Sequence, residues 1–292
     1  MRHSPGKGKW FVNILPKDRK RAVIAALVEG SSIRSTERMT GVHRDTIVRL
    51  LHRVGAGCAL HHDEAMYGLN LGTVQIDEIW AYVGKKQKNL RVKDDPELGD
   101  WYTFVALDNE TKLVPSYRVG RRTHLTAQNF IDDLGSRVEN RMQIFSDSFT
   151  PYADCIEETF GANVDYAQIQ KVYQDAPELR GRYSPGKFVE SIIKVIIGTP
   201  DEADISTSYV ERHNLTMRMA MRRFTRLTNA FSKTVVSLKA AVSLYFAHYN
   251  FVRIHRSTRT TPAMAAGVTD HVWDIDELLR CELDMGVTPC FP

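Results

Sequence analysis

The order of apolar segments between residues 74 and 160 restricts the fold of this chain more than any other feature of its sequence. Apolar runs of four to ten residues indicate buried strands, and a helical period indicates an amphipathic helix. The expected elements are, in order, strands at 74–83 (VQIDEIWAYV), 101–107 (WYTFVAL) and 112–119, a helix at 125–138, a strand at 142–145 (MQIF) and a helix at 152–160. The turn 108–110 (DNE) would join the second and third strands as an antiparallel hairpin.

Three strands, a helix, a strand and a helix is the order of the ribonuclease H-like fold, an α/β mixed sheet flanked by helices. In such a sheet the first and fourth strands lie side by side, so Asp77 and Asp147 are expected to converge. Burying the lone carboxylate of Asp77 costs several kcal/mol unless it binds a metal or pairs with an arginine. Both explanations stay open. Glu78 is expected to point to the opposite face, because side chains alternate along a strand.

The net charge of +4 conceals a strong segregation along the chain. Residues 1–62 carry +8 and residues 209–260 carry +9, whereas residues 63–208 carry −8 and the tail from 261 carries −5. Two basic blocks beside an acidic middle indicate phosphate-binding surfaces around a centre that requires cations. An ordinary solvated surface is the alternative.

The first basic block, assigned to residues 1–62, predicts a small all-α helix-turn-helix domain. Helices are expected at 18–30, 33–39 and 44–54, and the apolar residues of the third recur at helical spacing. The last helix of such a motif enters the DNA major groove. The side chains left on its outer face include Arg44, Thr46, Arg49 and Arg53. A basic three-helix bundle without DNA is the alternative. The glycine-rich stretch 55–73 reads as a linker, with the linker proper at 63–73.

The second basic block follows a predicted additional hairpin at about 162–200, inserted in a catalytic domain that spans residues 74–260. A helix at 209–223 carries Glu211 as its only acid, and Arg218 and Arg222 follow on the same face. This arrangement suits a metal beside a phosphate backbone, and surface charge is the alternative. Backbone contacts to DNA are expected from Arg218, Arg222, Arg223 and Arg226. A further helix is expected at 232–249, followed by a C-terminal tail at 261–292.

Six stretches between residues 74 and 267 together resemble one known family. They are QIDEIW, IFSDSF, TSYVERHNLTMRM, RRFTRLTNAFSK, HYNFVRIH and TPAMAAG. In this order they resemble transposases of the first-described bacterial insertion-sequence family, a branch of the DDE transposases. The resemblance implies that Asp77, Asp147 and Glu211 are the catalytic carboxylates. It also implies a helix-turn-helix that binds terminal repeats, matching residues 18–56 less specifically.

The resemblance further implies two Mg²⁺ (or Mn²⁺) ions per active site, held by Asp77, Asp147 and Glu211. Two such ions activate an attacking oxygen and stabilise the leaving one in DNA cleavage and strand transfer. The expected partners are double-stranded DNA, as element ends and target, and further copies of the chain in a homodimer or higher oligomer. His213 and Asn214 are possible accessory residues near the scissile phosphate, with helix packing as the alternative.

The chain differs from the family pattern in two respects, and two other functions are alternatives. The cysteine pairs of an N-terminal zinc finger are absent, and the 64-residue separation of Asp147 from Glu211 is long, which the inserted hairpin would explain. The scattered cysteines, the absence of a long apolar run and the start MRHSPGKGKW predict a soluble cytoplasmic protein. A domesticated transposase that acts as a repressor and a ribonuclease H-fold nuclease or resolvase are the alternatives.

Overall fold

A computed structural model describes residues 15–174, 187–225, 228–283 and 291 of the chain. The strands are β1 (Thr73–Val83), β2 (Gly99–Asp108), β3 (Tyr117–Gly120), β4 (Met142–Asp147), β5 (Val164–Gln174) and β6 (Lys187–Ile197). The helices are α1 (Lys17–Val28), α2 (Ile33–Thr40), α3 (Arg44–Ala65), α4 (His124–Arg137), α5 (Pro151–Phe160), α6 (Ser208–Ala220), α7 (Val235–Ala247), α8 (Pro262–Ala265) and α9 (Ile275–Arg280). No helix within the described ranges is long and apolar enough to cross a membrane.

The strands form one mixed sheet in the order β3-β2-β1-β4-β5-β6. The first three strands pair antiparallel, β4 lies parallel to β1, and β5 lies parallel to β4. This is the ribonuclease H-like arrangement predicted from the order of elements. The expected hairpin at about 162–200 is present as β5 and β6. Because β5 pairs with β4, both strands belong to the main sheet, and β6 forms its edge.

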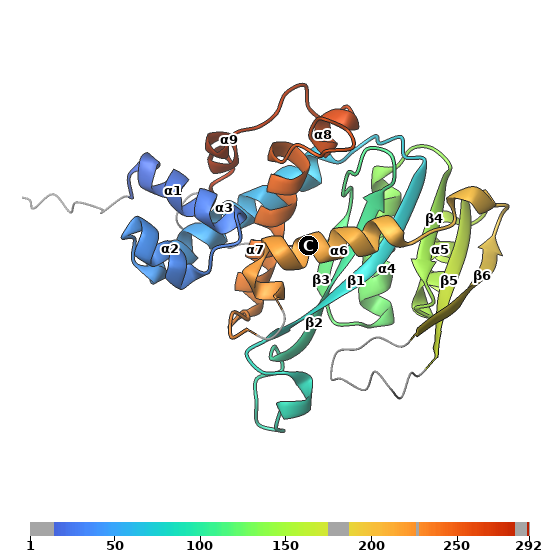
Figure 1. Ribbon diagram of the computed structural model, residues 1–292, viewed down its shortest axis with the longest axis horizontal. Helices are drawn as coiled ribbons and strands as arrows, with labels where there is room; N and C mark the ends of the chain where they lie inside the picture. The colour runs from blue at the N-terminus through green and yellow to red at the C-terminus, as the bar shows by residue number, and fades with distance from the viewer. Residues whose placement is uncertain (1–14, 175–186, 226–227, 284–290, 292) are drawn as a thin grey trace, which may run out of the picture.

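Helices cover both faces of the sheet (Figure 1). On one face, Phe130 and Ile131 of α4 and Tyr152 of α5 pack against Val74 and Ile76 of β1 in a buried apolar cluster. On the other face α6 and α7 cover β1, and their apolar residues bury the opposite side of the same strand. The alternation of β1 therefore divides its residues between two cores, as expected of a central strand with helices on both sides.

The third strand is shorter than the predicted 112–119. The backbone N–H of Val114 donates to the Asn250 side chain (3.1 Å), and the Asn250 amide donates to the Val114 carbonyl (2.9 Å). This side chain therefore takes the place of a strand partner at Val114. The pairing with β2 becomes regular only from Tyr117 onward.

The predicted third helix, 44–54, is too short, because α3 continues to Ala65 and includes part of the glycine-rich stretch 55–73. Its glycines allow close packing and not flexibility. A Cβ at Gly55 would lie 2.4 Å from the Ala240 carbonyl oxygen of α7, and one at Gly57 would lie 1.5 Å from the Cys281 carbonyl oxygen. The core of α1–α3 accordingly includes residues of α7 and α9.

Candidate active site

Asp77 and Asp147 lie on neighbouring parallel strands near the point where their pairing ends. The last paired residues of β1 and β4 are Ile76 and Ser146, so the two aspartates follow at equivalent positions. Each offers a carboxylate oxygen to a group in which all ligand atoms lie within 4.8 Å of one another, and Glu78 is its third member. The structure therefore brings together two of the three predicted acids, Asp77 and Asp147. The third acid of the group is Glu78, which was expected on the opposite face of the sheet.

Glu78 does point to the face of the sheet opposite Asp77, toward α4 and α5, but it still reaches Asp147. The reason is that Asp147 is the last residue of β4, beyond its pairing with β1, so its carboxylate approaches both sides of the neighbouring strand. The prediction that Glu78 points to the opposite face is therefore confirmed, but its carboxylate still joins the acidic group. No signal beyond its adjacency to Asp77 marks Glu78 in the sequence.

The acids of this group are poorly neutralised by their surroundings. Burial, with a further contribution from the charge of Asp147, raises the pKa of Asp77 to about 6. Burial and Asp147 likewise raise the pKa of Glu78 to about 8, although the Arg122 guanidinium lies 3.7 Å from its carboxylate. The Glu78 side chain is only 3% exposed, and its Oε1 has no hydrogen-bond partner in the part of the chain that the structure describes. Such a group favours a bound proton or cation.

Asn214 of α6 and the backbone of β1 hold the Asp77 carboxylate in place. The Asn214 amide donates to Asp77 Oδ2 (2.8 Å), and the backbone N–H of Glu78 donates to Asp77 Oδ1 (2.8 Å). Asn214, predicted as an accessory residue, therefore contacts a carboxylate. His213 does not, since it is buried against the rings of Phe246 and Tyr249, and burial lowers its pKa to about 3.

Gln75, which the sequence analysis did not single out, fixes the start of α6 on the sheet. Its side-chain oxygen accepts hydrogen bonds from the backbone N–H groups of Tyr209 (2.9 Å) and Val210 (3.0 Å). These donors belong to the first turn of the helix, where no intrahelical acceptor exists. The contact sets the position of Glu211, one residue further on.

Glu211 lies beside the acidic group without belonging to it. Its side chain is 45% exposed, forms an ion pair with Lys171 of β5 and accepts a hydrogen bond from Thr207 Oγ1 (2.7 Å). Its charge contributes to the raised pKa of Asp77, after burial and Asp147. Glu211 therefore lies close to Asp77 and Asp147, but its carboxylate is paired with the Lys171 ammonium group.

The predicted DNA-binding residues fall on two surfaces. Arg44 and Arg49 are exposed on α3, and Arg49 donates to Thr46 Oγ1 (3.3 Å). Arg53 faces the C-terminal segment instead, with an ion pair to Glu282 (2.6 Å). Near the end of α6, Arg222 is exposed, whereas Arg218 and Arg223 are partly buried. Arg226 lies outside the described residues.

Comparisons with known proteins give only distant likenesses. No described protein family and no curated protein matches the chain. The structure of the piggyBac transposase synaptic complex with hairpin DNA is 11% identical, with 91% of this chain and 70% of that chain covered and a TM-score of 0.41.

Two structures of the Mos1 transposase are also similar. The paired-end complex with the left transposon end is 15% identical, with 57% of this chain and 61% of that chain covered and a TM-score of 0.23. A pre-cleavage Mos1 transpososome is 11% identical, with coverages of 96% and 80% and a TM-score of 0.30. Likenesses this weak establish no activity, and the fold rests on the order and direction of the strands.

Proposed function

We propose that this chain is a DDE-type DNA transposase that cuts and joins DNA strands with divalent metal ions. The observation that carries the proposal is the poorly neutralised carboxylate pair Asp77 and Asp147 on adjacent parallel strands of a ribonuclease H-like sheet. The resemblance of its sequence motifs to an insertion-sequence transposase family supports the same activity.

The residues at the site fit a divalent cation. Asp77, Glu78 and Asp147 offer hard oxygen ligands within 4.8 Å of one another, and one buried oxygen of Glu78 accepts no hydrogen bond from the described residues. We assign Asp77, Asp147 and Glu211 as the ligands of two Mg²⁺ ions, and Glu78 as a carboxylate next to Asp147. When bound, the ions would lower the barrier to phosphodiester displacement by stabilising the attacking and leaving oxygens.

The protein itself orients the ligands and the DNA. Asn214 and the Glu78 amide fix both oxygens of Asp77, and Gln75 anchors the helix that carries Glu211. The exposed Arg44 and Arg49 of α3 are placed to contact DNA in the manner of a helix-turn-helix, with the terminal repeats of an insertion sequence as the expected site. Pairing two element ends requires at least two copies of the chain.

A strand-transfer assay with DNA that flanks the source element tests the proposal. The wild type is expected to nick the element ends and join them to target DNA with Mg²⁺ but not with EDTA. Asp77→Asn and Asp147→Asn should each lower this activity at least a hundredfold, about 2.7 kcal/mol of barrier. Neither should lower the thermal midpoint of the metal-free protein, because each removes one of several repelling charges.

The assay also separates the rival functions. Cleavage without joining would indicate a nuclease or resolvase. Binding to the ends with neither reaction would indicate a repressor derived from a transposase. Either result contradicts the proposed strand-transfer activity.

A further inference from the structure

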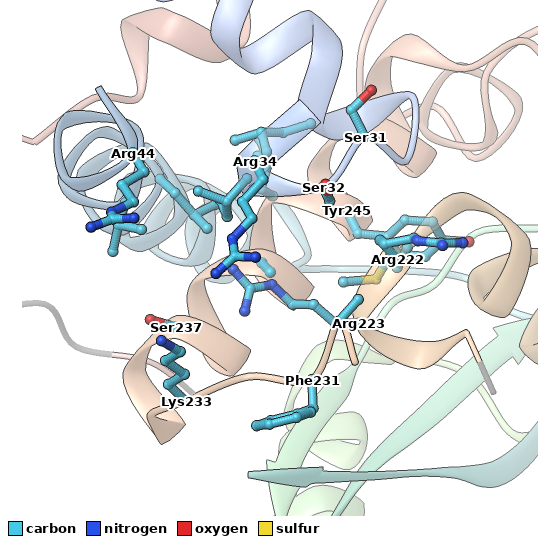
Figure 2. Close-up of a pocket in the computed structure, with 18 of the residues that line it drawn as sticks. Ser31, Ser32, Arg34, Arg44, Arg222, Arg223, Phe231, Lys233, Ser237 and Tyr245 are labelled. Carbon is cyan, nitrogen blue, oxygen red and sulfur yellow. The ribbon is translucent and has the colours of Figure 1, made fainter. Parts of the chain in front are cut away.

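A cleft of about 1140 Å³ separates the N-terminal helices from the segment that joins α6 to α7 (Figure 2). Its walls come from the end of α1, α2 and α3 on one side and from residues 220–223 and 228–245 on the other. Among the described residues, five Arg and Lys side chains line it, and Asp45 is the only acid. The basic residues are Arg34, Arg44, Arg222, Arg223 and Lys233.

Arg223 has no anionic partner among the residues that the structure describes, since no carboxylate there lies within ion-pair distance of it. Its guanidinium donates a hydrogen bond to Ser232 Oγ (2.9 Å). Burial lowers the pKa of Arg223 to about 10. A partly buried guanidinium that lacks a counter-ion is unfavourable, so the local structure is suited to an anion supplied from outside.

Arg34 of α2 adds a second charge at the same place. Figure 2 shows the guanidinium groups of Arg34 and Arg223 pointing toward each other across the cleft. Within the described ranges, Arg34, Arg222 and Lys233 have no carboxylate at ion-pair distance either. Like charges that face each other repel, and a phosphate between two guanidinium groups converts this repulsion into charge-assisted hydrogen bonds.

The shape and lining of the cleft restrict the class of molecule that can supply the anion. Between the basic side chains its floor is apolar, with Leu51, Leu244 and Tyr245 among its residues. Its volume of about 1140 Å³ lies slightly above the range of about 300 to 1,000 Å³ that is usual for small-ligand sites, which leaves room for a short length of chain. A basic rim over an apolar and aromatic floor is the pattern of proteins that follow a nucleic-acid backbone.

We propose that this cleft binds the phosphodiester backbone of DNA, with one phosphate held between Arg34 and Arg223. This inference rests on the proposed function and adds to it a second DNA contact, which adjoins the outer face of α3 at Arg44 and continues to Arg34 and Arg223. One DNA strand would thereby bridge the N-terminal helices and the end of α6, the helix that carries Glu211. Binding would relieve the repulsion between Arg34 and Arg223 and hold the two parts of the protein together.

The test is a fluorescence-anisotropy titration of labelled element-end DNA in EDTA, so that no chemistry contributes. Arg34→Glu and Arg223→Gln are each expected to weaken binding at least tenfold. Each should also reduce the slope of log affinity against log salt by about one, as expected for one lost phosphate contact. Arg34→Lys should lie between wild type and Arg34→Glu, because it keeps the charge but loses the bidentate geometry.

The matched control is Arg38→Glu, which makes the same charge change on an exposed position of the same helix outside the cleft. It is expected to change affinity less than threefold. Arg34→Glu should also raise the thermal midpoint of the DNA-free protein, because it places a carboxylate opposite Arg223. That gain should shrink in the Arg223→Gln background, which separates the ion pair from any effect of the charge on α2 itself.

The outcomes distinguish failure of this inference from failure of the proposed function. Wild-type protein that does not bind DNA contradicts the proposed function. Wild-type protein that binds DNA while Arg34→Glu and Arg38→Glu bind equally well overturns the cleft alone. Inorganic phosphate that raises the thermal midpoint through Arg34 and Arg223, with no loss of DNA affinity in the variants, shows a small-anion site and also overturns it.

Discussion

At the scale of single residues, Asp147 lies close to two acids, Asp77 and Glu78, whose side chains point to opposite faces of the sheet. Asp77 approaches it from the face covered by α6, where Asn214 donates to its carboxylate. Glu78 approaches it from the face covered by α5, where Arg122 and the buried ring of Tyr152 lie nearby. The charges of these carboxylates, after burial, raise the pKa of Tyr152. A cation held by Asp77 and Asp147 would therefore take its third ligand from one of two residues. These are Glu211 on the face covered by α6 and Glu78 on the face covered by α5.

Replacing Glu211 or Glu78 with glutamine shows which of the two supplies the third ligand. Glu211→Gln is expected to lower Mg²⁺-dependent strand transfer at least a hundredfold, about 2.7 kcal/mol, with DNA binding unchanged. Glu78→Gln should stay within about tenfold, roughly 1.4 kcal/mol. It should not lower the thermal midpoint, because a neutral amide of the same shape replaces a carboxyl group whose pKa burial raises to about 8, so that it is mostly protonated at neutral pH. Strand-transfer rates of both variants give the answer, and the reverse order of effects would assign the third ligand to Glu78.

His62 provides a prediction about pH. It is buried on α3, and burial followed by the charge of Arg137 lowers its pKa to about 4 from 6.5. Between these values the unfolded chain binds a proton that the folded chain does not, so the free energy of unfolding falls as pH falls from about 6.5 to about 4. His62→Gln removes this proton and keeps a donor for the Val114 carbonyl.

The His62→Gln variant should therefore lose stability less steeply on acidification than the wild type. The difference in slope approaches about 1.4 kcal/mol per pH unit, the value for one proton. Urea unfolding at several pH values between about 4 and 7 measures it. Parallel curves for the two proteins would show that His62 does not titrate differently in the two states.

At the scale of elements, sequence patterns predicted the parts of the fold that depend on local periodicity. The strands and helices between residues 73 and 160 occur in the expected order, and the sheet follows from it. Sequence patterns did not predict the features that depend on a side chain from a distant part of the sequence. Asn250 replaces a strand partner at Val114, and Gln75 supplies acceptors for α6 across more than 130 residues. Neither contact leaves a periodic signal.

The docking of α6 by Gln75 is testable. Gln75→Met keeps the length of the side chain but removes the oxygen that accepts from Tyr209 and Val210. Loss of such a helix-start acceptor at a buried position is expected to cost about 1–3 kcal/mol of unfolding free energy. Strand transfer should also fall, because Glu211 lies in the same helical turn, while DNA affinity is retained.

Gln170→Met provides the matched control, since Gln170 is an exposed residue of β5. It should leave both stability and strand transfer near those of the wild type. Chemical unfolding and strand-transfer rates of the two variants give the comparison. Equal behaviour of both would mean that α6 keeps its position without the Gln75 contacts.

At the scale of the whole molecule, the basic N-terminal block and the acidic tail neutralise each other in part. Lys17 pairs with Asp276 (3.1 Å), Lys20 pairs with Glu282 (2.6 Å), and Arg53 shares Glu282 (2.6 Å). Segment charges counted along the sequence therefore overstate the positive charge that remains for DNA. Within the N-terminal block, the basic residues on α2 and on the outer side of α3 face away from α9 and are left to bind phosphate.

The same interface leads to a prediction about Gly57. Its hydrogen faces the Cys281 carbonyl so closely that a Cβ would lie 1.5 Å from that oxygen, with backbone on both sides of the contact. Gly57→Ala must therefore separate α3 from the C-terminal segment, although alanine favours the helix itself. Overpacking of this kind costs about 1–3 kcal/mol, against a gain of up to about 1 kcal/mol from helix propensity.

Gly72→Ala is the control, because its added Cβ would meet only the end of the flexible Glu110 side chain, at 3.3 Å, and its backbone is not in the left-handed region. Urea unfolding of both variants measures the difference. Gly57→Ala should lower the free energy of unfolding, while Gly72→Ala should leave it nearly unchanged. If Gly57→Ala is instead as stable as the wild type, α3 and the C-terminal segment are not held at this contact, and the N-terminal helices behave as the separate unit that the glycine-rich sequence predicts.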